Sequence, residues 1–114
     1  MSITISERNV GPVTIIDLNG AIKAGNDAHI GDKVRSLLQQ GRKKMLVNLA
    51  HVPYVDSVGL GELVQAYTTA TNQGGALKIV NATSRIHDLL VITRLATVFE
   101  LFDDEGKAVA SFGA

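Results

Sequence analysis

Asp56 and Ser57 are the residues of this chain whose types and spacing carry the clearest chemical meaning. They stand between an apolar segment and a stretch with helical periodicity, in the order NLAHVPYVDSVGLGELVQAY over residues 48–67. A serine hydroxyl at such a junction can cap the helix, attack a substrate or accept a phosphoryl group. Aspartate is an equally good cap, so the residues alone leave capping and function open as alternatives for Ser57.

Hydrolytic chemistry at Ser57 is not supported by its surroundings. The nucleophile motif Gly-x-Ser-x-Gly needs a glycine at the position that Val55 occupies, and a general base is needed as well. The sequence has three histidines, which are His29, His51 and His87. They are scattered and show no pairing with an acid. We therefore expect no catalytic residues and a protein that is not an enzyme.

Metal and cofactor sites lack a sequence signal too. No histidine pair or carboxylate cluster has the spacing of metal ligands, and the chain contains no cysteine. The acidic run at 103–105 is typical of a helix start, and GLGE at 59–62 lacks the lysine and the spacing of a phosphate-binding loop. We therefore expect neither a metal nor a cofactor.

The surroundings of Ser57 favour a protein contact. Gly59 and Gly61 fall in the first turns of the predicted helix, where each costs up to about 1 kcal/mol relative to alanine. Close approach by another surface would explain this cost, and so would packing against a neighbouring strand. Tyr54 and Val58 place apolar side chains beside the hydroxyl, and they are predicted docking contacts, with core packing as their alternative.

The elements that must position Ser57 begin with a hairpin. Alternating apolar residues predict a strand over residues 2–8, and VTIIDL predicts a second strand over 13–18, with the turn sequence NVGP between them. The short connection makes this pair antiparallel. MLVNL at 45–49 and ALKIV at 76–80 are apolar enough for central strands, and VFELF at 98–102 suits a short last strand.

Two helices flank the strand at 45–49. The first is predicted to begin at a cap formed by Asn26 or Asp27 and to end at Gly41. Its apolar stripe consists of Ile30, Val34, Leu37 and Leu38. The second helix is predicted to run from Ser57 to Asn72, directly after the strand and its loop.

Two further helices complete the pattern. Ser84 is the predicted cap of the third, which breaks at 93–97, and Asp103 or Asp104 caps a fourth that continues through Phe112. The order β-β-α-β-α-β-α-β-α predicts an α/β fold with a mixed, mostly parallel sheet of about five strands and about four helices. The first strand is its antiparallel edge.

Composition narrows the possible partners. Lysines and arginines equal the acidic residues in number, so the net charge is zero and no direct contact with nucleic acid is expected. No apolar run is long enough to span a bilayer, and no targeting segment is visible, so we expect no membrane association and a cytoplasmic location. With 114 residues, the chain is expected to form one domain over 1–114.

The segment VDSVGLGEL resembles the Asp-Ser-x-Gly-Leu motif of the anti-sigma factor antagonists, which are small domains of the STAS superfamily. The resemblance covers nearly the whole chain. It includes the opening hairpin, the first helix ending at Gly41, the strand and loop MLVNLAHVPYVDS, the strand GGALKIVN, and the segment LLVITRLATVFELFDDEGKAV. It implies a STAS-type fold for the single predicted domain.

The resemblance also implies a phosphorylation switch. In that family, the unphosphorylated domain binds an anti-sigma factor that is also a serine kinase, which releases the sigma factor. Phosphorylation by this kinase inactivates the domain, and a serine phosphatase resets it. Ser57 would be the phosphoacceptor, and Asp56, Gly59 and Leu60 would complete the motif at the docking surface.

Asn48 departs from the family, whose strand often has aspartate there, and this weakens any claim for a second charge near the site. Other STAS domains act as scaffolds or as regulatory subunits of larger signalling or transport assemblies, which is the alternative function. Because this domain stands alone and keeps the serine, we expect an antagonist that is a monomer when free.

Overall fold

The computed structural model describes residues 3–113 and has the predicted order of elements. These are β1 (Thr4–Val10), β2 (Val13–Asn19), α1 (Ile30–Gln39), β3 (Lys44–His51), α2 (Ser57–Asn72), β4 (Ala76–Val80), α3 (Ser84–Ile92), a 3-10 turn (Leu95–Thr97), β5 (Leu101–Phe102) and α4 (Glu105–Ala110). The order β-β-α-β-α-β-α-β-α is therefore confirmed. The strand predicted over residues 2–8 begins at a residue outside the described range.

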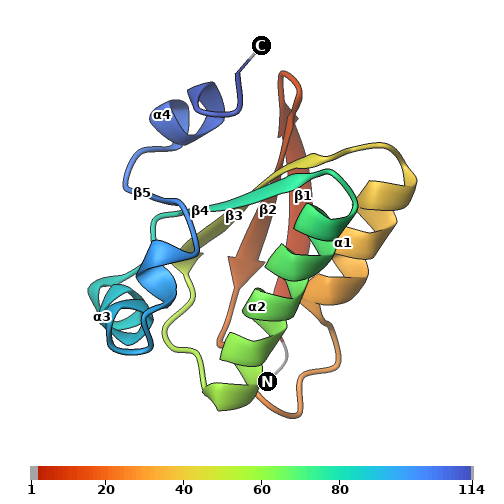
Figure 1. The fold of residues 1–114 in the computed structure, drawn as a ribbon. Coiled ribbons are helices and arrows are strands. Elements are labelled where there is room, and N and C mark those ends of the chain that lie inside the picture. Colours follow the sequence, from red (N-terminus) through yellow and green to blue (C-terminus); the bar gives the residue numbers. More distant parts are fainter. Residues whose placement is uncertain (1–2, 114) are drawn as a thin grey trace.

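The five strands form one sheet in the order β1-β2-β3-β4-β5 (Figure 1). β1 runs antiparallel to β2 at one edge, and every other neighbouring pair is parallel. The predicted mixed, mostly parallel sheet is confirmed. Because β2 and β3 are parallel neighbours, their carboxyl ends meet at the same edge of the sheet, and the loops that follow them lie together.

The two faces of the sheet are covered unequally. α1 and α2 lie side by side over one face (Figure 1), where they bury the larger hydrophobic core together with α3. On the sheet, this core includes Ile16, Met45, Val47 and Ile79. The opposite face carries a smaller cluster under α4, made of Val13, Ile15, Leu46, Val80 and Ala108. Each large apolar side chain buried in this way stabilises the fold by roughly 1.5–3 kcal/mol.

Gly41 ends α1 as predicted. Its φ angle of +76° lies in the left-handed region, which glycine adopts without a steric penalty. The N–H of Gly41 donates to the carbonyl of Leu38 at 3.0 Å, and the N–H of Arg42 donates to the carbonyl of Leu37 at 2.9 Å. This pair of hydrogen bonds is the Schellman motif, which satisfies the last carbonyls of the helix.

The predicted start of α1 is wrong. His29 occupies the cap position, and its side chain makes no capping hydrogen bond. Asn26 is buried and uses its side-chain amide to donate to the carbonyl of Ala21 at 3.0 Å, which closes the loop between β2 and α1. Asp27 is exposed and lies before the cap position. The bend between residues 26 and 29 therefore separates both predicted caps from the helix.

The caps of α3 and α4 are set by single residues. Thr83, and not the predicted Ser84, caps α3 by accepting the N–H of Ile86 at 3.4 Å. Asp104 caps α4 by accepting the N–H of Lys107 at 2.9 Å, which confirms one of the two predicted alternatives. Ser84 is the first residue inside α3, so the predicted cap is one residue too late.

The C-terminal strand and helix are shorter than predicted. β5 covers only Leu101–Phe102, because the N–H groups of Val98 and Phe99 turn back to the carbonyl of Leu95. Phe99 then enters the core, where its ring packs edge-on against Tyr67 with centroids 5.2 Å apart. α4 ends at residue 110 rather than 112.

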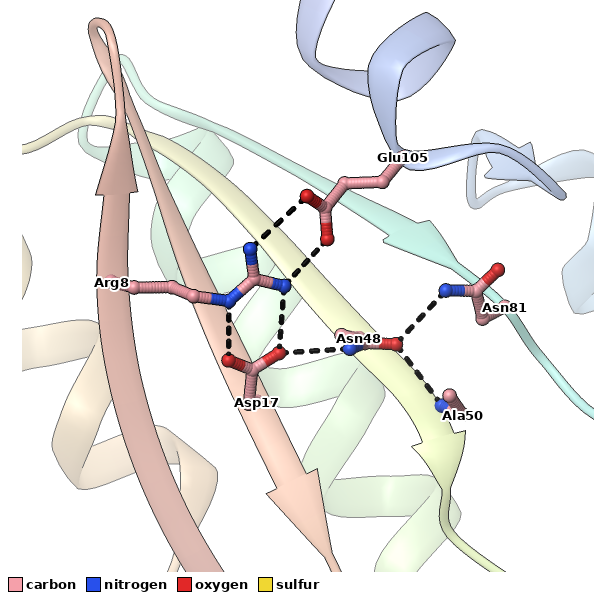
Figure 2. A network of polar contacts seen from close by, with 6 residues as sticks. All are labelled: Arg8, Asp17, Asn48, Ala50, Asn81 and Glu105. Atoms are coloured by element: carbon pink, nitrogen blue, oxygen red, sulfur yellow. Dashed lines mark hydrogen bonds and ion pairs between the residues drawn. The ribbon is translucent and has the colours of Figure 1, made fainter.

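Arg8 connects the edge of the sheet to α4 (Figure 2). Its Nε donates to Asp17 on β2 at 2.7 Å, and its Nη2 donates to Glu105 at the start of α4 at 2.5 Å. These hydrogen bonds are the main cause of the lowered pKa of both carboxyl groups. The pairing ties the N-terminal hairpin to the last helix.

Asn48 continues this network toward β4 (Figure 2). Its Nδ2 donates to Asp17 at 2.8 Å, while its Oδ1 accepts from the side chain of Asn81 at 3.2 Å and from the N–H of Ala50 at 3.1 Å. An aspartate at position 48 would place a second carboxylate against Asp17. The amide of Asn48 instead donates a hydrogen bond to the carboxylate of Asp17 and adds no negative charge.

We expect Arg8→Ala to lower the free energy of unfolding by about 1 kcal/mol at pH 7, because it removes two partly exposed ion pairs. The ordinary pKa values of Asp17 and Glu105 are 3.8 and 4.5, and both are lowered in the folded chain. Their contribution is thus present above about pH 4.5 and is lost as the pH falls through the lowered values. Urea denaturation at pH 7 and pH 3 measures this difference.

Arg35→Ala is the matched control for that comparison. Arg35 pairs with Asp32 within the exposed surface of α1, so its loss is expected to cost less and to connect no separate elements. A deficit of Arg8→Ala that persisted unchanged at pH 3 would contradict the electrostatic explanation and would indicate lost packing instead.

Candidate functional site

The connection between β3 and α2 is held by the loop that follows β2. The N–H of Gly20 donates to His51 at 3.0 Å, and the N–H of Ile22 donates to Tyr54 at 3.2 Å, both through backbone carbonyls. Ile22 and Val55 form a parallel bridge beyond the ends of the named strands. The segment that carries the motif is therefore fixed by continued strand-like pairing.

Asp56 is the cap of α2. Its Oδ1 accepts the N–H of Gly59 at 2.8 Å, and its Oδ2 accepts the N–H of Ala24 at 3.0 Å. Its own N–H donates to the carbonyl of Ile22 at 3.2 Å. The hydrogen bond from Gly59 is the main cause of a lowered pKa of Asp56, with further contributions from Ala24 and from the charge of Lys23. Asp56 therefore joins the helix start to the loop after β2.

Ser57 is the first residue of α2 and is exposed. Its hydroxyl makes no hydrogen bond or other polar contact with any of residues 3–113. Because Asp56 performs the capping, the capping alternative for Ser57 is wrong. The hydroxyl is free to react with, or contact, another molecule.

Gly59 is explained by packing inside the chain. A Cβ atom at this position would lie 1.9 Å from the carbonyl oxygen of Ile22, so only glycine lets α2 approach the loop this closely. Gly61 differs, because a Cβ there would meet no atom within 4 Å. The two glycines that looked alike in the sequence therefore have different surroundings.

The apolar residues around Ser57 differ in exposure. Val58 is 51% exposed, so its core-packing alternative is wrong. Leu60 is partly buried and packs against the larger core. Tyr54 is partly exposed, and the guanidinium of Arg85 on α3 lies 5.7 Å from the centre of its ring. The structure thus brings Tyr54, Ser57 and Val58 together at one edge of the sheet, with Leu60 supporting them.

Sequence reasoning missed the second side of this site. The loop over residues 20–24 is hydrogen-bonded to the segment that carries the motif, and Arg85 lies over the ring of Tyr54. Neither has a motif of its own. The parallel order of the strands is the signal that finds the loop, because loops after neighbouring parallel strands meet at one edge. No comparable signal identifies Arg85.

An imidazole–carboxylate pair joins the start of α1 to α2. His29 contacts Glu62 at 2.5 Å, and no hydrogen bond joins it to Ser57. Residues 3–113 contain no group of three or more metal-ligating side chains. In the same part of the chain, every helix is too short or too polar to traverse a lipid bilayer.

We expect Asp56→Ala to release the start of α2 from the loop after β2. The amides of Ala24 and Gly59 would lose their acceptor, and their hydrogen exchange, followed by NMR, should become faster. The lowered pKa means that the carboxylate stabilises the fold above its ordinary pKa of 3.8, and that this effect is lost as the pH falls further. The melting temperatures of variant and wild type should therefore converge in acid.

Ser57→Ala is the control, since it leaves the carboxylate in place and should keep both amides protected. Equal exchange rates in wild type and Asp56→Ala would show that the two hydrogen bonds do not hold the segment.

Comparison with known proteins agrees with this fold. The STAS domain family model matches residues 4–108. The anti-sigma-B factor antagonist of Listeria monocytogenes is 30% identical over 94% of this chain and 93% of its own length. The anti-sigma F factor antagonist of Paenibacillus polymyxa is 24% identical, over 96% of this chain and 94% of its own length.

Solved structures show the same fold at lower identity. SpoIIAA has been solved in an unphosphorylated form, with a TM-score of 0.70, and a phosphorylated form from Bacillus, with a TM-score of 0.73. Both are 16% identical to this chain; the first match covers 97% of this chain and 100% of SpoIIAA, and the second covers 96% and 99%.

The chain belongs to the STAS domain family, in the group formed by the anti-sigma factor antagonists. The resemblance inferred from the motif and the STAS-type fold are both confirmed. Members of this group are regulatory binding proteins and not enzymes.

Proposed function

We propose that this protein is an anti-sigma factor antagonist controlled by phosphorylation of Ser57. When unmodified, it binds an anti-sigma factor that is also a serine kinase, and the sigma factor is released. Phosphorylation by this kinase inactivates the domain, and a serine phosphatase restores it. The protein acts in the cytoplasm, and residues 1–114 form one STAS domain.

The observation that carries this proposal is the exposed, unbonded hydroxyl of Ser57 next to a capping aspartate. A kinase can reach such a hydroxyl without unfolding the helix, because the cap belongs to Asp56. The exposed side chain of Val58 and the partly exposed ring of Tyr54 supply apolar contact area around it. This surface is supported from below by residues at the start of α2, namely Asp56, the buried Gly59 and Leu60.

The switch follows from charge at an interface. A phosphate on Ser57 would add roughly −1.5 to −2 charges beside the carboxylate of Asp56. A transient complex of this kind buries about 800 Å² per partner, and the phosphate would be desolvated within that area. A penalty of about 3 kcal/mol weakens binding by about two powers of ten. The fold itself should survive, since negative charge is favoured at a helix N-terminus.

Phosphorylation by candidate kinases tests the proposal. The domain is incubated with ATP and anti-sigma factors that contain a serine kinase domain, and the modified peptide is identified by mass spectrometry. We expect one phosphate, on Ser57, and none on Ser57→Ala. Modification of Ser84 in place of Ser57 would contradict the proposal, because Ser84 is also the exposed first residue of a helix.

A further inference from the structure

Lys23 is held beside the motif by both of its neighbours in the chain. Ile22 accepts the N–H of Asp56 through its carbonyl at 3.2 Å, and Ala24 donates its N–H to the Asp56 carboxylate at 3.0 Å. Ile22 is buried and paired as in a strand, and successive side chains of a strand point to opposite sides. Lys23 therefore points away from the buried side of Ile22, and its side chain is partly exposed.

The loop around Lys23 is closed by a side-chain hydrogen bond. The buried side chain of Asn26 donates to the carbonyl of Ala21 at 3.0 Å, which joins the two ends of the turn that contains Lys23. The ammonium group forms no ion pair within residues 3–113. Its charge nevertheless contributes to the lowered pKa of Asp56, so it lies within electrostatic range of the motif.

We infer that Lys23 is the counter-cation of a phosphate on Ser57. The inference rests on the proposed function, because it concerns the phosphorylated domain. Asp56 alone would repel the phosphate, and Lys23 is the cation whose two neighbours in the chain, Ile22 and Ala24, are hydrogen-bonded to that aspartate. Its flexible four-carbon stem allows the ammonium to follow the phosphate oxygens.

This pairing would change the surface in two ways. The phosphate would stay doubly ionised at neutral pH, because a nearby cation favours the more negative form. Phosphorylation would also engage a positive charge that has no ion-pair partner among residues 3–113 of the unmodified domain. The modified surface would therefore lose a partly exposed free cation as well as gain an anion.

The test uses the whole chain with phosphoserine incorporated at position 57 during translation, so no kinase is needed. The second pKa of the phosphate is measured by phosphorus NMR as the pH is changed. In Lys23→Ala, we expect this pKa to rise by about 0.2–0.7 unit above the wild-type value, as for the loss of an exposed ion pair. Lys23→Arg keeps the charge and should keep most of the wild-type value.

Two control variants separate Lys23 from other cations. Lys107→Ala removes an exposed lysine on α4, and Arg85→Ala removes the cation next to Tyr54. Neither should shift the phosphate pKa as Lys23→Ala does. An unchanged pKa in Lys23→Ala, or an equal shift in Arg85→Ala, would overturn the inference.

The titration and the kinase assay test two separate hypotheses, so either hypothesis can be contradicted without the other. If no kinase modified Ser57, the proposed function would fail while the titration still reported on Lys23. If a kinase modified Ser57 and Lys23→Ala left the phosphate pKa unchanged, only the role of Lys23 would be wrong. Circular dichroism of each variant confirms that the fold is intact before the titration is interpreted.

Discussion

Ser57→Asp is expected to weaken binding to the anti-sigma factor at least tenfold while leaving the melting temperature nearly unchanged. The exposed hydroxyl is not part of the core, and a carboxylate is favoured at a helix N-terminus, so the fold should tolerate the change. At the interface, the new charge would be desolvated beside Asp56, and about 1.4 kcal/mol of repulsion is enough for a tenfold loss. Calorimetric titration and thermal denaturation measure the two quantities separately.

Ser57→Ala is the control for this prediction. It removes the phosphoacceptor and adds no charge, so it should bind as wild type does and should resist phosphorylation. If Ser57→Asp unfolded the domain, or if both variants bound equally well, the repulsion at the interface would not be the basis of the switch.

Much of the fold was predictable because each element carries a local signal. The hairpin follows from an alternating segment, a β-branched run and the short turn between them, and the end of α1 follows from Gly41 in a left-handed conformation. The position of Ser57 beyond the end of β3 also follows from the apolar run that precedes it. These signals depend only on residues that are close in the sequence, so they can be recognised without knowledge of the tertiary structure.

The helix caps could not be assigned from local sequence signals alone. Asp56 and Ser57 are both good cap residues, and so are Thr83 and Ser84, so propensity does not separate the members of either pair. At the motif, the aspartate makes a hydrogen bond that the serine does not, because the N–H of Ala24 reaches its second oxygen from another loop. That donor is distant in the sequence, and only the packing of the loops reveals it.

The short β5 has a comparable tertiary cause. The segment VFELF has the composition of a strand. However, Phe99 packs in the core against Tyr67 on α2, and the chain forms a turn there instead of pairing with β4. The role proposed for Lys23 has no sequence signal for the same reason, since it depends on hydrogen bonds between its loop and Asp56. Residues that matter through a distant partner are thus the ones that sequence patterns leave out.

Gly59→Ala is expected to destabilise the domain by about 3 kcal/mol, the upper part of the usual range for overpacking. The added Cβ would lie 1.9 Å from the carbonyl oxygen of Ile22 and 2.5 Å from its carbonyl carbon, and both are backbone atoms that cannot rotate away. Relief requires α2 to move from the loop, which breaks the hydrogen bond between Asp56 and Ile22. Urea denaturation gives the free energy of unfolding.

Gly61→Ala is the matched control, two residues further along the same helix. Its Cβ would point into open space, and alanine is favoured over glycine within a helix by about 1 kcal/mol, so this variant should be more stable than wild type. The opposite signs separate the steric effect at Gly59 from helix propensity. If both variants were stabilised, α2 would not depend on close contact with Ile22, and the rigid placement of Ser57 would lose its structural basis.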